Sequence, residues 1–274
     1  MVSDRFHLHL VSDSTGETIT SVAKACLVQF EGVHVEEHVW ALVRTDRQVR
    51  KVVAAVEREP GVVLFTLVDA KLRTALEQAC RQLQVPCVSI LDPAIGALTG
   101  YLGVKSSQKP GLQHMLDAEY FNRIDAINFV LAHDDGQLVK DLNDADVILV
   151  GVSRTSKTPT CIYLANRGVK AANVPLVPTH PLAPELLAAT RPLIVGLTRD
   201  PASLVQIRRN RLKALNQHEE TEYVDPEKVK EEVAAARRTF DKYRWHMIDV
   251  SRRSIEEVAA EILQLIDRRK GRIT

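Results

Sequence analysis

The sequence lacks any long hydrophobic run. Its longest apolar segments, residues 62–68 and 147–150, are far shorter than the roughly 20 residues that span a bilayer. The first five residues lead directly into the alternating segment 6–10, without the apolar stretch and cleavage site of a secretory signal. We therefore expect a cytoplasmic protein that does not associate with a membrane.

The sequence also lacks an excess of either charge. Its 36 basic residues (lysine and arginine) and 35 acidic residues give a formal net charge of +1, so no global field would hold the protein on nucleic acid. Any anion must then bind at a local site. Aromatic residues make up 5% and hydrophobic residues 45% of the 274 residues, which is typical of a soluble globular protein with an aliphatic core.

Cysteine and histidine are present without the spacing of a metal site or a disulfide framework. Cys26, Cys80, Cys87 and Cys161 form no C-x-x-C pair and have apolar neighbours in sequence, so we expect reduced core thiols. No Ser-His-Asp arrangement stands out either. His7 and His9 alternate along one expected strand, where core or surface roles are favoured over metal ligation.

What the sequence does contain is an alternation of short apolar runs with amphipathic segments. Strands are predicted at 6–11, 34–43, 62–68 and 86–90, and helices at 17–30, 46–57 and 70–83. Such a βαβ rhythm favours a parallel sheet. Residues 91–111 are rich in glycine and proline, and we expect turns there.

The same alternation of strands and helices is predicted in the second half of the chain. A helix is expected over 116–131, and further helices at 157–166 and from Pro201, Pro226 and Ser254, the last opened by an S-x-x-E capping box. The predicted strands are 146–151, 174–177, 193–197 and 245–250.

The strongest site signal is the segment 146–158, which combines a buried strand, a loop of small residues and a Lys-Thr pair opening a helix. It approaches the template G-x-x-x-x-G-K-[ST], in which loop amides surround a phosphate, the lysine reaches the terminal phosphates and the hydroxyl binds magnesium. Ser156 replaces the second glycine. The predicted phosphate-binding residues are Gly151, Val152, Ser153, Arg154, Thr155, Ser156, Lys157 and Thr158.

The alternative interpretation of this segment is an ordinary strand-to-helix turn with a solvated lysine. On the phosphate-loop interpretation, the fold class is α/β, with a Rossmann-like parallel domain over 1–140 and a P-loop kinase-like domain over 141–274.

Two further segments are candidates for the site. Residues 11–18 place hydroxyls and the Asp13 carboxylate at the end of the first strand, although Ser14 or Thr15 could merely cap the next helix. Four arginines surround the helix that starts at Pro201. Arg199 directly follows a strand and is the favoured phosphate ligand. Arg208 and Arg211 lie three residues apart on one helix face and could clamp successive phosphates, or they could form a solvated face together with Arg209.

Several segments together carry a family pattern. They are the loop and helix over 151–160 and 162–168, the strand region 172–178, and the segments 11–18, 194–198, 248–251 and 254–257. These segments resemble the pyruvate, phosphate dikinase regulatory protein family, and the likeness spans nearly the whole chain.

The resemblance implies a bifunctional enzyme that acts on a protein substrate. Such an enzyme uses ADP to phosphorylate a threonine of pyruvate, phosphate dikinase, which inactivates it. It removes the phosphoryl group with inorganic phosphate, which releases pyrophosphate. We then expect Lys157 to neutralise moving charge, Thr158 to bind Mg²⁺, and Asp13 or Asp249 to orient or deprotonate the target threonine; a homodimer is expected by analogy.

Other functions stay open at this point. The Thr155-Ser156 pair favours the dikinase branch over a sister group that acts on phosphoenolpyruvate synthase. The loop would also suit a small-molecule P-loop kinase or a non-catalytic nucleotide sensor.

Overall fold

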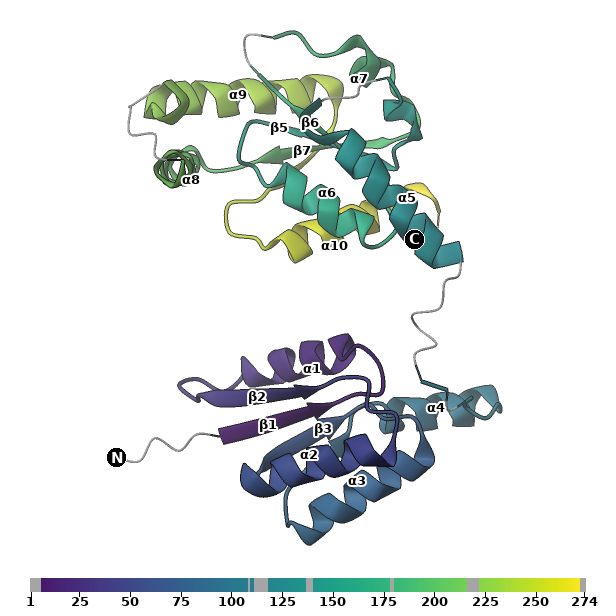
Figure 1. The fold of residues 1–274 in the computed structure, drawn as a ribbon. Helices are drawn as coiled ribbons and strands as arrows, with labels where there is room; N and C mark the ends of the chain where they lie inside the picture. Colours follow the sequence, from purple (N-terminus) through teal and green to yellow (C-terminus); the bar gives the residue numbers. More distant parts are fainter. Residues whose placement is uncertain are drawn as a thin grey trace. The chain divides into compact units, whose positions relative to one another are not determined.

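The computed structural model describes residues 6–107, 109–110, 118–136, 140–177, 180–215 and 222–271. The chain forms two compact units, Met1–Met115 and Leu116–Thr274. Each unit is built on a parallel four-stranded sheet with helices on its faces (Figure 1). The predicted α/β class with two α/β domains is therefore confirmed.

The first unit follows the predicted alternation closely. Its sheet has the order β2-β1-β3-β4 with all strands parallel. Apolar side chains of α2 and α3 pack on one face of this sheet, and those of α1 pack on the other. The elements are β1 (Phe6–Val11), α1 (Glu17–Leu27), β2 (Val35–Trp40), α2 (Asp46–Arg58), β3 (Gly61–Phe65), α3 (Ala70–Gln82), β4 (Cys87–Ser89) and α4 (Asp92–Leu102).

Helix α4 lies where the sequence predicted turns. A proline stands in its first turn and Gly103 ends it in the left-handed conformation, with φ of 67°. These are ordinary helix start and stop signals. The two glycines inside the helix, Gly96 and Gly100, disfavour helix by only about 1 kcal/mol each, and the remaining residues outweigh them.

The second unit repeats the strand order of the first. Its sheet runs β6-β5-β7-β8, again fully parallel. The elements are α5 (Ala118–Ala132), β5 (Val147–Gly151), α6 (Lys157–Ala165), β6 (Ala171–Pro175), α7 (Pro184–Ala188), β7 (Leu193–Thr198), α8 (Pro201–Ala214), α9 (Pro226–Tyr243), β8 (His246–Asp249) and α10 (Ile255–Arg269), with short 3₁₀ turns at Asp134–Gly136, Leu142–Asp144 and Glu222–Val224.

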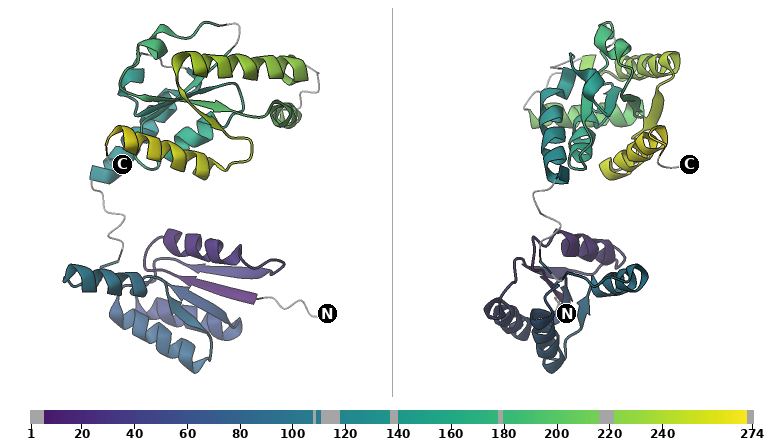
Figure 2. Two further views of the ribbon diagram at one scale, coloured as in Figure 1. Left: turned by 180° about the vertical axis from the view of Figure 1, so that it is seen from behind. Right: turned by 90° about the vertical axis from the view of Figure 1, so that its right-hand side faces the viewer.

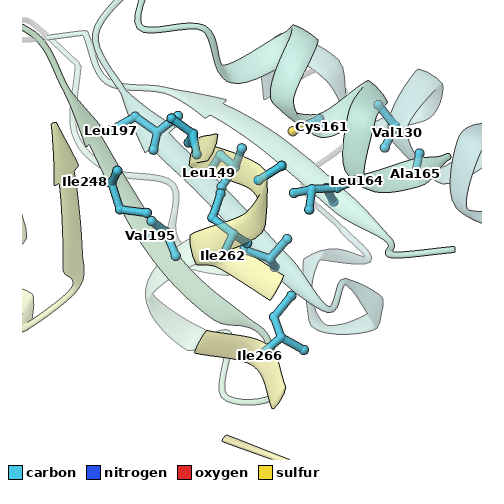
Figure 3. Packing of buried hydrophobic residues seen from close by; sticks show 14 of the residues in the cluster. Val130, Leu149, Cys161, Leu164, Ala165, Val195, Leu197, Ile248, Ile262 and Ile266 are labelled. Carbon is cyan, nitrogen blue, oxygen red and sulfur yellow. The ribbon is translucent and has the colours of Figure 1, made fainter. Parts of the chain in front are cut away.

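Helices cover both faces of this second sheet (Figure 2), and each face has its own buried core. Helices α5, α6 and α10 pack on one face, where Leu149, Val195 and Ile248 of the strands meet Leu164 and Ile262 of the helices (Figure 3). Helices α8 and α9 pack on the other face. Strand β5 is buried along its whole length, so its carboxyl end lies inside the domain.

The predicted domain boundary at residue 140 is wrong, because the units divide between residues 115 and 116. Helix α5 belongs to the second unit, since Ala126 and Val130 are buried in the same core as α6 and β5. Strand β6 also begins earlier than the predicted 174, at Ala171.

The predicted helix starts in the second unit are confirmed. Asp200 and Asp225 accept backbone hydrogen bonds from Ser203 and Lys228 at 2.8 and 2.9 Å, and Ser254 forms the complete capping box. None of the helices in the described ranges is both long and apolar enough to cross a membrane. Cys80 and Cys161 are buried as predicted, whereas Cys26 is exposed.

A packing test follows from Gly196 in β7. A Cβ atom there would lie 2.6 Å from the Phe240 ring of α9. Gly196→Ala should therefore destabilise the second unit by about 1–3 kcal/mol through overpacking. The measurement is urea unfolding followed by Trp245 fluorescence in a Trp40→Phe background. Gly100→Ala, where a Cβ meets nothing within 4 Å, is the control; equal stability of the two variants would contradict this account.

Candidate phosphate-binding site

The predicted phosphate loop lies at the carboxyl end of β5, between that strand and α6. The chain goes from β5 to β6 on one side and later to β7 on the other side, so the end of β5 is the topological switch point of the sheet. Open α/β sheets bind ligands at this point. The strand, loop and helix predicted from the sequence are all present.

The loop backbone has the left-handed conformation at two non-glycine residues, with φ of 71° at Arg154 and 62° at Ser156. Ser156 is the N-cap of α6. The serine therefore adopts a left-handed conformation, which glycine adopts without strain, at a cost of about 1–2 kcal/mol. Gly151 is required for another reason, because a Cβ there would lie 2.5 Å from the Leu197 carbonyl oxygen of β7.

Lys157 is buried under the loop, with 5% of its surface exposed. Its Nζ donates to the Val152 carbonyl oxygen at 3.1 Å, and the Thr155 hydroxyl donates to the same oxygen at 2.9 Å. Burial lowers the pKa of Lys157 to about 8, although the nearby Asp135 and Asp134 carboxylates oppose this shift. The alternative of a solvated lysine in an ordinary turn is therefore wrong.

A polar cluster that the sequence analysis did not identify lies beside the loop. The Thr158 hydroxyl donates to Asp134 Oδ1 at 2.9 Å, and Asn173 Nδ2 donates to Asp134 and Asp135 at 2.6 and 3.0 Å. Asn173 Oδ1 is buried and has no hydrogen-bond partner among the described residues. The only sequence signal for this cluster was the adjacent acidic pair Asp134 and Asp135 just after α5. This pair is separated from the loop along the chain by the whole of β5.

Arg199 completes the site from the end of β7. Its Nη2 lies 3.4 Å from Ser156 Oγ, and its buried Nε has no partner within the described part of the chain. Burial lowers its pKa, and Asp249 opposes that shift. A cavity of about 280 Å³ is lined by Asp135, Ser153, Arg154, Ser156, Lys157, Thr158, Pro159, Asn173, Pro175, Arg199 and Ile207.

The predicted clamp of Arg208 and Arg211 is wrong. Arg208 is 1% exposed, and its guanidinium donates to the Tyr223 carbonyl, the Ser153 carbonyl and the Glu232 carboxylate at 3.0, 3.3 and 2.7 Å. It therefore fixes the loop from beneath instead of facing a ligand. Arg209 and Arg211 are exposed on α8, as the alternative of a solvated face predicted.

Asp249 lies at the end of β8, on the same edge of the sheet as Arg199. Partial burial would raise its pKa, but hydrogen bonds from Ser251 and the charges of Arg237 and Arg199 lower it overall. Asp249 does not line the loop cavity. A carboxylate with a lowered pKa orients a hydroxyl better than it removes a proton.

Asp13 lies in the first unit, whereas the loop belongs to the second. Its Oδ2 accepts from the Val68 amide at 2.7 Å, and burial raises its pKa despite this bond. Asp13 therefore links the loops that follow β1 and β3. The N-cap of α1 is Gly16, and not Ser14 or Thr15.

His7 and His9 have structural partners in the first unit. His9 is fully buried and its Nε2 lies 2.9 Å from the Glu59 carbonyl oxygen, while His7 Nδ1 lies 3.0 Å from His38 Nε2. No cluster of three or more His, Cys, Asp or Glu side chains suited to a metal occurs in the described ranges. The histidines thus have the core and surface roles that the sequence favoured.

Known proteins are similar to this chain over most of its length. The family model for kinase/pyrophosphorylase matches residues 8–263. A relative from Paramagnetospirillum magneticum is 61% identical over 96% of this chain and 85% of its own, and one from Rhizorhabdus wittichii is 53% identical over 98% of both chains. A relative from Caulobacter vibrioides is 52% identical over 98% of this chain and 85% of its own.

All three relatives carry the name "Putative pyruvate, phosphate dikinase regulatory protein". The family match covers most of the chain and includes the loop over 151–158, the acidic pair and Arg199. The chain belongs to the kinase/pyrophosphorylase family.

Proposed function

We propose that this protein regulates pyruvate, phosphate dikinase by phosphorylating one of its threonines with ADP and by removing that phosphoryl group with inorganic phosphate. The observation that carries the proposal is the buried Lys157 beneath the 151–158 loop, facing a polar cavity together with Arg199. The names of the relatives support the choice of the dikinase as the protein substrate.

The loop would hold the β-phosphate of ADP. Its amides and the N-terminus of α6 supply oriented N–H donors, and Lys157, Arg154 and Arg199 supply positive charge. Lys157 Nζ now donates to a carbonyl oxygen, and a phosphate oxygen is a stronger acceptor for the same ammonium. Phosphoryl transfer depends mainly on such positioning and charge stabilisation.

The polar cluster fits a magnesium ion. Thr158, Asp134 and Asp135 offer the hard oxygen ligands that Mg²⁺ prefers, and the unpartnered Asn173 Oδ1 is a further oxygen donor. When bound, Mg²⁺ neutralises charge on the phosphates. Since only two of these side chains are carboxylates, water and phosphate oxygens would supply the remaining ligands.

The 151–158 loop would serve both phosphorylation and phosphorolysis. In the forward reaction the threonine oxygen bonds to the β-phosphorus, the bond from that phosphorus to the AMP oxygen breaks, and the hydroxyl proton leaves. In the reverse reaction an oxygen of inorganic phosphate bonds to the phosphothreonine phosphorus, the threonine oxygen leaves and takes up a proton, and pyrophosphate is released.

We assign the orientation or deprotonation of the threonine to Asp249 or Asp13. Asp249 shares a sheet edge with Arg199, but its pKa is lowered, so it suits an orienting role. Asp13 has a raised pKa, which suits a proton acceptor better. The effects of Asp249→Asn and Asp13→Asn on the rate of transfer would separate the two.

A labelling experiment tests this function. Purified dikinase, already phosphorylated on its catalytic histidine, is incubated with β-labelled ADP, and Lys157→Met is compared with wild type. The variant should lose both forward labelling and phosphorolysis by two or more orders of magnitude, because one cation serves both. Lys228→Ala, which alters an exposed lysine of α9, is the control.

Four outcomes would contradict the proposal. Binding of ADP without transfer to the dikinase would identify a nucleotide sensor, and consumption of nucleotide with a small acceptor alone would identify a small-molecule kinase. Labelling of phosphoenolpyruvate synthase instead of the dikinase would identify the sister activity. Intact phosphorolysis in Lys157→Met would show that the two reactions use different sites.

The lowered pKa of Lys157 predicts that ADP affinity depends on pH. The free protein holds this amine charged only below pH about 8, whereas a bound phosphate would keep it charged at higher pH. Above that value ADP binding must take up a proton, so the affinity should fall by about tenfold per pH unit. Calorimetry at pH 9 in buffers of different ionisation enthalpy should show uptake of nearly one proton. Lys157→Arg, which stays charged, should show no uptake; uptake by that variant would assign the effect to another group.

A further inference from the structure

A second cavity, of about 360 Å³, lies next to the loop cavity in the second unit. Asp135 and Pro175 line both cavities. Val152 also lines the second cavity, and its carbonyl oxygen accepts the hydrogen bond from Lys157 Nζ. The second cavity therefore adjoins the place where a terminal phosphate would bind.

The walls of this cavity come from two directions. Val174 at the end of β6, with Leu176 and Leu182 in the segment after that strand, forms one apolar wall. Helix α9 forms the other wall with Ala235 and Ala236, and it adds the polar groups of Glu232 and Thr239. Apolar walls with a few polar groups are typical of small-molecule sites, which usually occupy about 300–1,000 Å³.

We propose that this cavity binds the nucleoside of the nucleoside diphosphate whose β-phosphate lies in the 151–158 loop. The inference rests on the proposed function for the position of that phosphate. The flat, weakly polar faces of a base suit the apolar walls, and its polar edge suits Glu232 and Thr239. Arg208 holds Glu232 in place through a 2.7 Å hydrogen bond, so the side chain is fixed before a ligand binds.

The order of the strands gives an independent argument. The strand residues that line the cavity belong to β6. Arg199 follows β7 and Asp249 ends β8, and both of these strands lie on the other side of β5. In-line phosphoryl transfer requires the leaving and attacking oxygens on opposite sides of phosphorus. A nucleoside on the β6 side therefore directs the attacking threonine to the side of Arg199 and Asp249.

A second consequence concerns the reverse reaction. Inorganic phosphate and pyrophosphate have no nucleoside, so they need the loop but not the second cavity. Filling the second cavity should then separate the two reactions, which removal of Lys157 cannot do.

Ala235→Phe fills the cavity from a half-buried position of α9 that lies outside the buried core cluster. Calorimetry should show the dissociation constant for ADP raised about tenfold or more, which corresponds to at least about 1.4 kcal/mol of lost contacts. The constant for pyrophosphate should stay within about twofold of wild type, since pyrophosphate has no group that enters the cavity. Ala260→Phe, at an exposed position of α10, is the matched control, and Ala235→Leu is the milder variant if the phenylalanine prevents folding.

The outcomes separate this inference from the proposed function. If Ala235→Phe and Ala235→Leu bind ADP as wild type does, the nucleoside assignment is wrong even when transfer to the dikinase proceeds. If the variants bind ADP normally but require more dikinase for half-maximal rate, the cavity binds the protein substrate instead. If ADP affinity falls selectively while the wild type transfers nothing to the dikinase, the nucleoside site stands and the proposed function fails. A wild type that does not bind ADP overturns both.

Discussion

The site depends on one buried cation. Lys157 lies under the loop at the end of β5, and its ammonium donates to the Val152 carbonyl oxygen at 3.1 Å. An unpaired buried charge is costly, so the surroundings must compensate, and the Asp134 and Asp135 carboxylates and the carbonyl do so only in part. Burial therefore still lowers the pKa of Lys157 to about 8. In the proposed function, a bound phosphate would supply the missing negative charge.

The elements around the loop are arranged to keep this cation in place. Arg208 is itself buried, and it ties the Ser153 carbonyl of the loop to Glu232 of α9. On the other side, Asn173 of β6 joins Thr158 to the acidic pair after α5. The loop is thus held from both faces of the sheet before any ligand binds. Preorganised charge of this kind is what phosphoryl transfer requires.

The two units share one strand order and differ in the residues that come after their first strand. In the first unit the segment after β1 contains Asp13, whose carboxylate accepts from the amide of Val68 after β3 and so links neighbouring loops. In the second unit the segment after β5 turns around a lysine. The same topology therefore supports a linked sheet edge in one unit and the candidate phosphate-binding loop in the other, because the residues at the switch point differ.

The sequence alone determined the α/β class, most strands and helices, and the strand, loop and helix of the candidate phosphate-binding site. These features follow from signals between near neighbours, such as the cap at Asp200, the capping box at Ser254 and the strand before Gly151. It misplaced the domain boundary because the packing of α5 into the second core is not a local signal. It missed α4 because Gly96 and Gly100 inside the helix outweighed the start and stop signals at its ends. Only the tertiary structure brought Asp134, Asp135 and Asn173 to Thr158, and only the tertiary structure buried Arg208. The reason is that crossover connections, and not spacing along the chain, decide which side chains meet at one edge of a parallel sheet.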